Sequence, residues 1–141
     1  MDKSRGRAMM KPTSEAGRRW AAALQLELEQ WPGVVAKRAF GMVLVYRGKI
    51  VFAALPGTRA LYEEDAILIK FTRESPSLAR RIADEKCFDK GTMQQGGRKK
   101  RGKSRKWRIY LLRNERDARE AVEWLALAYK LAARRDSEFP A

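Results

Sequence analysis

The chain has 141 residues, with 31 Lys and Arg against 17 Asp and Glu, a formal net charge of +14, one cysteine and no histidine. One cysteine excludes an internal disulfide, and the lack of histidine excludes the usual zinc sites, Ser-His-Asp and Cys-His catalysis, and the commonest general base at neutral pH. The length suits one domain with its own core, and no apolar run is long enough for a membrane span or typical of a secretory signal.

This composition predicts a reduced, cytoplasmic protein that is not an enzyme and holds no metal or cofactor. A surface this basic draws polyanions, such as nucleic acid, by long-range attraction and counterion release. General solubility, or the arginine preference of a GC-rich genome, is the alternative explanation of the charge.

Residues 1–12 carry four cations and few large apolar side chains, which is typical of a flexible basic tail. An amphipathic transit segment is the alternative, because Asp2 is the only acid there. A helix is expected to begin after Thr13 or Ser14, either of which can cap it, and to end at Pro32-Gly33. Its buried stripe recurs at helical spacing and comprises Trp20, Leu24, Leu28 and Trp31.

Residues 38–55 predict two strands folded back on each other as a hairpin. Arg47 and Gly48 are expected to form the tight turn, because glycine accepts the positive φ that short hairpin turns require. The alternate positions are also apolar, so the hairpin is expected to be central in a sheet and at least partly covered on both faces. One face is expected to take Phe40, Met42, Leu44 and Tyr46 from the first strand and Ile50, Phe52 and Ala54 from the second.

A polar connection follows, and its three acids at 63–65 are interpreted as solvated surface, since no histidine accompanies them as a metal ligand. Residues 67–72 predict a third strand, and residues 75–85 predict a helix with a serine cap and a proline at its first position. Cys87 is interpreted as inert packing.

The most unusual composition lies between Lys90 and Lys106, where glycine, glutamine and basic residues alternate without an apolar period. Self-repulsion and low hydrophobicity predict a flexible loop that becomes ordered when a polyanion neutralises it. Residues 107–112 then resume the strand alternation. A last helix is expected to begin at a cap on Asn114 and to run to about Arg135.

This order of helices and strands predicts the fold class α+β: a two-layer sandwich with an antiparallel sheet of four to five strands and helices packed mainly on one face. The expected organisation is a flexible basic tail at 1–12, one domain at 13–135 with a flexible basic loop at 90–106, and a disordered tail at 136–141.

Several short runs in the same order resemble the MmcQ/YjbR family of small domains and are similar to the TfoX N-terminal domain. They are Phe40-Gly41, residues 46–53, residues 67–71, Trp107 and residues 128–131. The resemblance covers about residues 20–133 and implies a compact sandwich, DNA binding as assigned to YjbR, and no catalytic residue. The chain departs from the family in the insertion at 90–106, in its basic N-terminal tail and in lacking a histidine in the late strand.

The leading hypothesis is a non-enzymatic module that binds nucleic acid, DNA in particular, through phosphate contacts of low sequence specificity. An exposed Trp107 or Tyr110 would stack on a base, although a tryptophan in a strand is more often part of the core. The alternative is a protein-interaction or chaperone-like module that uses the open sheet face, with a homodimer as one form of it. No membrane partner is expected. The predicted nucleic-acid contacts are Lys37, Arg38, Arg47, Lys49, Arg98, Lys99, Lys100, Arg101, Lys103, Arg105, Lys106 and Arg108.

Overall fold

The computed structural model describes residues 11–12, 14–57, 59–60, 65–94 and 106–133. Six of the described strands form one antiparallel sheet in the order β2-β3-β4-β6-β8-β7, and two short ones, β1 and β5, pair separately. The bounds along the chain are β1 Lys11–Pro12, α1 Glu15–Glu29, β2 Val34–Ala39, β3 Met42–Arg47, β4 Ile50–Pro56, β5 Arg59–Ala60, β6 Ala66–Ile69, α2 Pro76–Asp84, β7 Phe88–Gln94, β8 Lys106–Leu111 and α3 Glu115–Leu131.

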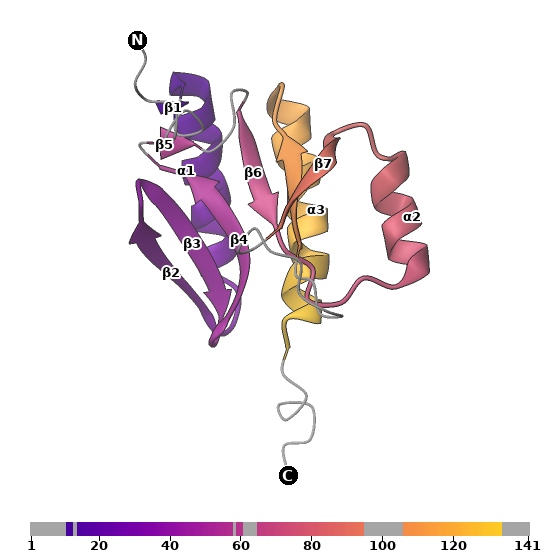
Figure 1. The fold of residues 1–141 in the computed structure, drawn as a ribbon. Helices are drawn as coiled ribbons and strands as arrows, with labels where there is room; N and C mark the ends of the chain where they lie inside the picture. Colours follow the sequence, from indigo (N-terminus) through magenta and orange to yellow (C-terminus); the bar gives the residue numbers. More distant parts are fainter. Residues whose placement is uncertain (1–10, 13, 58, 61–64, 95–105, 134–141) are drawn as a thin grey trace.

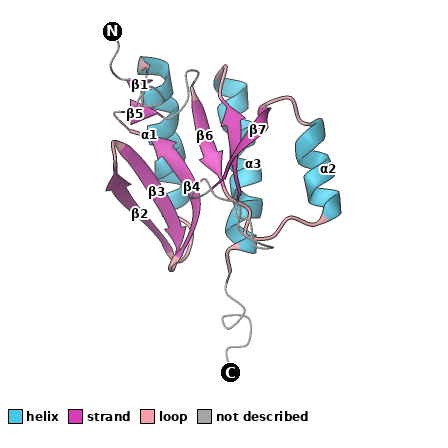
Figure 2. Cartoon of the chain, viewed as in Figure 1, coloured by secondary structure: helices cyan, strands magenta, loops and turns pink. Residues whose placement is uncertain are grey.

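The molecule has two layers. Helices α1 and α3 lie behind the sheet in Figure 1, and α2 lies beyond strand β7 at the right of the view. Figure 2 shows the same separation of helices from strands. All three helices bury side chains in one apolar cluster with the facing strands. The predicted α+β sandwich, with helices mainly on one face, is confirmed. None of the described helices is long and apolar enough to cross a bilayer.

The sheet has six strands where the sequence predicts four to five. One addition is β2, which pairs with β3 and turns back at Phe40 and Gly41, so the hairpin predicted from residue 38 is a three-stranded meander. The second turn of the meander is Gly48–Lys49, one residue later than predicted, because Arg47 still pairs with Ile50.

The other addition is β7, which places residues 90–94 in a strand paired with β8. Lys106 is also a strand residue, the first of β8. The predicted loop at 90–106 is therefore too long at both ends, because backbone pairing with β8 orders residues that have no apolar period of their own. The remaining segment 95–105 lies outside the described residues, as do 1–10 and 134–141.

A bulge in β4 changes which side chains face the helices. Val45 pairs with Ala53 and Tyr46 with Val51, so Phe52 is an extra residue in the ladder. Phe52 and Ala53 therefore both join the helix-side cluster, while Ala54 joins the cluster on the other face. The strict alternation predicted for this strand is wrong at that point.

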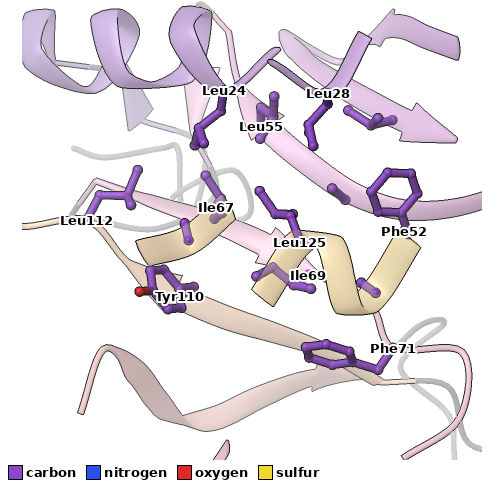
Figure 3. Close-up of a cluster of buried hydrophobic side chains, with 14 of the residues drawn as sticks. Leu24, Leu28, Phe52, Leu55, Ile67, Ile69, Phe71, Tyr110, Leu112 and Leu125 are labelled. Atoms are coloured by element: carbon purple, nitrogen blue, oxygen red, sulfur yellow. The ribbon is translucent and has the colours of Figure 1, made fainter. Parts of the chain in front are cut away.

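The main core lies between the sheet and the helices. Its ten labelled side chains in Figure 3 come from α1, from α3 and from the strands and their flanks. A second, smaller cluster occupies the opposite face and contains only strand residues: Met42, Ala54, Ala66, Leu68, Ile109 and Leu111, with Leu44 and Trp107 against them. The expectation of partial cover on both faces of the central strands is confirmed.

The helix starts follow the capping residues in the sequence. The Ser14 hydroxyl accepts from the Gly17 N–H at 2.9 Å, and the Asn114 side chain accepts from the Asp117 N–H at 2.9 Å. Ser75 caps α2 in the same way. Asp65, the one described member of the acidic trio, accepts from the Ser14 hydroxyl at 2.9 Å. Asp65 therefore anchors the start of α1.

Candidate nucleic-acid interface

Half of the predicted nucleic-acid contacts lie outside the described residues, and they all belong to segment 95–105. This segment has eleven residues, six of them cations and none of them acids. The six are Arg98, Lys99, Lys100, Arg101, Lys103 and Arg105.

The strand registers locate where this basic segment joins the sheet. Gln94 at the end of β7 pairs with Lys106 at the start of β8. Strand β8 is antiparallel to β6, and β6 is antiparallel to β4, so β8 begins at the same end of the sheet as β4. Since β4 starts directly after the Gly48–Lys49 turn, the exposed Lys49 lies at the sheet end where the segment is attached.

Two of the predicted contacts already have partners within the chain. The guanidinium of Arg47 lies 4.1 Å from the centroid of the Tyr129 ring and donates to the Tyr129 carbonyl at 3.0 Å, near the end of α3. Arg108 donates from Nε to Glu74 at 2.8 Å and forms a second contact to the same carboxylate. This hydrogen bonding raises the pKa of Arg108, against the opposing effect of burial. Both side chains therefore make contacts within the fold, and a count of charges in the sequence cannot show such contacts.

The face of the sheet opposite the helices carries two cation–aromatic pairs. The ammonium of Lys37 lies 5.5 Å from the centroid of the Tyr46 ring. The ammonium of Lys70 lies 5.4 Å from the centroid of the Trp107 ring, and Trp107 packs on the second apolar cluster. This face therefore combines one exposed cation, Lys37, with two partly exposed rings, a combination found where proteins bind single-stranded nucleic acid.

Sequence reasoning missed Lys70. It follows the four apolar residues of β6 and precedes Phe71, and it is only 8% exposed. A lysine between apolar residues such as Ile69 and Phe71 is the signal that could have found it, because a buried lysine side chain needs a partner.

The two aromatic residues predicted as base-stacking candidates differ in position. Trp107 is partly exposed on the helix-free face. Tyr110 is fully buried on the helix side, where its ring packs edge-on against Phe88 with centroids 5.0 Å apart. The expectation that Tyr110 could stack on a base is therefore wrong, because its neighbours at 109 and 111 take the opposite face and turn it toward the helices.

Cys87 belongs to a buried polar cluster beside Tyr110. Its thiol donates to Asp117 at 3.4 Å, and the Tyr110 hydroxyl donates to the Asp117 carbonyl at 3.4 Å. Burial raises the pKa of the Cys87 thiol to about 11, and burial likewise raises the pKa of Tyr110. A protonated thiol is a poor nucleophile, so this cluster supports the prediction that Cys87 is inert packing. The described residues contain no group of acids, cysteines and histidines that could hold a metal ion.

The first turn of the meander presents an exposed aromatic ring. Phe40 is 85% exposed and has a φ of +55°, and Gly41 follows with a φ of +78°. Two positive φ values between the paired residues Ala39 and Met42 match a type I′ hairpin turn. A hollow of about 170 Å³ lies beside this turn and is lined by Arg38, Ala39, Phe40, Gly41, Met42, Val43 and Gly57.

A separate hollow lies between α2 and α3. Its volume is about 520 Å³, and Leu78, Leu127 and Leu131 form its apolar part. Arg73 and Arg81 line it as well, but Arg81 also stacks over the Trp124 ring at 5.1 Å. No lining residue other than Leu78 is buried.

No known protein family matches this chain, and no curated protein or solved structure matches it either. The resemblance to the MmcQ/YjbR family therefore stays a prediction from the short runs described above.

Proposed function

We propose that the chain is a non-enzymatic, cytoplasmic module that binds nucleic acid, chiefly DNA, through phosphate contacts and with low sequence specificity. The binding surface consists of segment 95–105 together with the face of the sheet that carries no described helix. The resemblance to the MmcQ/YjbR family belongs to the same proposal, since it implies DNA binding.

The observation that carries the proposal is the pairing of Gln94 with Lys106. The residues that flank this six-cation segment, Gln94 and Lys106, thus lie at the same end of the sheet as Lys49, and Lys106 begins the strand that holds Trp107. Cations concentrated in this way neutralise several phosphates at once, and each neutralised phosphate releases condensed counterions. The exposed Lys37, beside the Tyr46 ring, adds one more cation on the helix-free face.

The test is a salt series with a labelled generic duplex and the matching single strand. Contact with six to eight phosphates predicts that log affinity falls with log salt at a slope of roughly −5 to −7 for the duplex and roughly −4 to −6 for the single strand. Replacing residues 98–106 by Gly and Ser should remove most of this slope. A flat salt response of the intact protein would contradict the proposal.

A matched control separates the location of charge from its amount. The variant Arg98→Gln, Lys99→Gln, Lys100→Gln removes three cations from the segment, and the variant Arg18→Gln, Arg19→Gln, Arg119→Gln removes three exposed cations from α1 and α3. The first should reduce the magnitude of the slope by roughly 2 to 3. The second should leave the slope nearly unchanged, because those helices lie on the other side of the sheet.

The second candidate function is a protein-interaction or chaperone-like module that forms a homodimer through the open sheet face. The exposed Val35 and the outer position of strand β2 favour it, because an edge strand can pair with another chain. The second apolar cluster argues against it, since its six buried members are at most 6% exposed within one chain. A mass that doubles with concentration in sedimentation, together with no binding to either nucleic acid, would favour this candidate.

A further inference from the structure

Phe40 holds an unfavourable backbone conformation in an exposed position. Its φ of +55° lies in the left-handed region, where glycine and asparagine are favoured and a bulky side chain is strained. Its ring gains almost nothing from burial, because 85% of the residue is exposed. Asparagine would satisfy the turn better, so the needs of the fold do not explain a phenylalanine here.

The turn that carries Phe40 is held in place by a glycine from another strand end. The Gly57 N–H donates to the Gly41 carbonyl at 3.1 Å. A Cβ atom at Gly57 would lie 2.7 Å from that carbonyl oxygen, so this close approach requires glycine. The exposed ring therefore projects from a fixed backbone, and a ligand that contacts it does not first have to order the turn.

The charged residues near the Phe40 ring indicate which class of ligand it would bind. The exposed cations Lys37 and Arg38 precede it on β2, and Arg38 lines the hollow beside the turn. Residues 30–62 contain no acid, so the sequence around the ring favours an anionic ligand. Attachment to a membrane needs a larger apolar surface than one ring. A planar ring next to positive charge suits a nucleobase with its phosphate. The single strand is favoured over the duplex, because an unpaired base offers its flat face for stacking whereas a duplex exposes only base edges.

We propose that Phe40 stacks on a base of single-stranded nucleic acid, with Arg38 binding a neighbouring phosphate. This inference rests on the proposed function and names its substrate class. It also gives the strained turn a role: the phenylalanine is kept at the expense of turn stability for contact with the ligand.

The decisive variant is Phe40→Asn, because asparagine tolerates the positive φ and the variant should fold at least as well as the parent. Its affinity for a labelled short single strand should fall roughly 5- to 150-fold, the usual effect of losing one base–aromatic stack. Its salt slope should stay unchanged, because no cation is removed. Unchanged affinity of Phe40→Asn would overturn the inference while leaving the proposed function in place.

Two further variants make the result specific. Phe40→Trp should keep the affinity, and its added indole fluorescence should be quenched when the single strand binds. Leu26→Asn, which replaces another exposed apolar residue on the outer surface of α1, should change the affinity by less than about twofold. An equal loss in Leu26→Asn would overturn the inference, because the effect would then follow surface hydrophobicity in general.

Other partners give different results in the same experiment. A stronger effect of Phe40→Asn on the matching duplex would assign the ring to duplex distortion instead of single-strand stacking. Phe40-dependent binding to vesicles of phosphatidylserine and phosphatidylcholine, without binding to the oligonucleotide, would assign it to a membrane surface. Absence of binding by the intact protein to either oligonucleotide at low salt would overturn the proposed function itself.

Discussion

The two turns of the β2–β3–β4 meander both require a residue with a positive φ, but they use different residue types there. At the second turn, Gly48 adopts a φ of +63° and no atom lies within 4 Å of the place a Cβ would take. At the first turn, a phenylalanine adopts a φ of +55° and exposes its ring. The second turn therefore has the residue that folding requires. The first has a residue that folding alone does not require, which is why we assign it to binding.

The largest expected effect on stability comes from Cys87, which lies outside both turns. The pKa of Cys87 rises from 9.0 to about 11 on folding. The folded state therefore holds this proton more tightly, so its contribution is complete below pH 9 and is lost as the pH rises through about 11. The expected loss is roughly 2–3 kcal/mol. Urea unfolding across this pH range should show the loss in the parent and a smaller one in Cys87→Ala. Equal losses in both proteins would contradict the assignment.

The close approach of Gly57 to the first turn should be the larger of the local effects. In Gly57→Ala, the new methyl group would meet the Gly41 carbonyl oxygen at 2.7 Å, and the backbone has to shift. We expect a loss of about 2 kcal/mol in the free energy of unfolding, measured by urea denaturation. Weaker single-strand binding should accompany it, because the ring loses its fixed position. A variant as stable as the parent would show that the turn is not held by this contact.

The second turn should respond to backbone strain alone. Gly48→Ala meets no neighbouring atom but places a side chain at a φ of +63°, so the expected cost is about 1–2 kcal/mol. Gly48→Asn should cost less, since asparagine tolerates this region. Nucleic-acid affinity should be unchanged in both variants at a temperature where they are folded. A loss of affinity there would remove the contrast between the two turns.

The smallest expected effect on stability is that of Phe40→Asn, which should stabilise the protein whereas the other variants destabilise it. Phe40→Asn should raise the free energy of unfolding by about 1 kcal/mol, because it relieves strain at a positive φ. For a domain of this size the midpoint of thermal unfolding should rise by about 3 to 5 °C. A decrease in stability would show that the ring supports the fold, and would contradict its assignment to binding.

Much of the fold could be predicted from local pattern. Alternating apolar residues predict the central strands, and Ser14, Ser75 and Asn114 mark the helix starts through their capping side chains. The edge strands β2 and β7 were not predicted, because their order depends on hydrogen bonds from a neighbouring strand more than on apolar periodicity. The bulge at Phe52 was missed for a related reason, since it is a property of pairing between strands.

The candidate site was harder to predict from the sequence than the fold. A count of cations cannot separate those with partners inside the chain from those without, so Arg47 and Arg108 were predicted as nucleic-acid contacts although Tyr129 and Glu74 engage them. Phe40 was placed with its neighbours on a strand face, because it continues the apolar alternation of Met42 and Leu44, whereas β2 ends at Ala39. Its exposure and positive φ become visible only once the turn is known.

Binding of single-stranded nucleic acid at the first turn and the helix-free face is best tested by a two-dimensional ¹H–¹⁵N NMR titration of the full chain, which maps the backbone amides that respond to the oligonucleotide. We expect chemical-shift changes at residues 37–41, at Tyr46, Lys49 and Trp107, and none for amides on the outer surfaces of α1 and α3. Shifts confined to those helices, or none at a saturating concentration at low salt, would contradict this expectation.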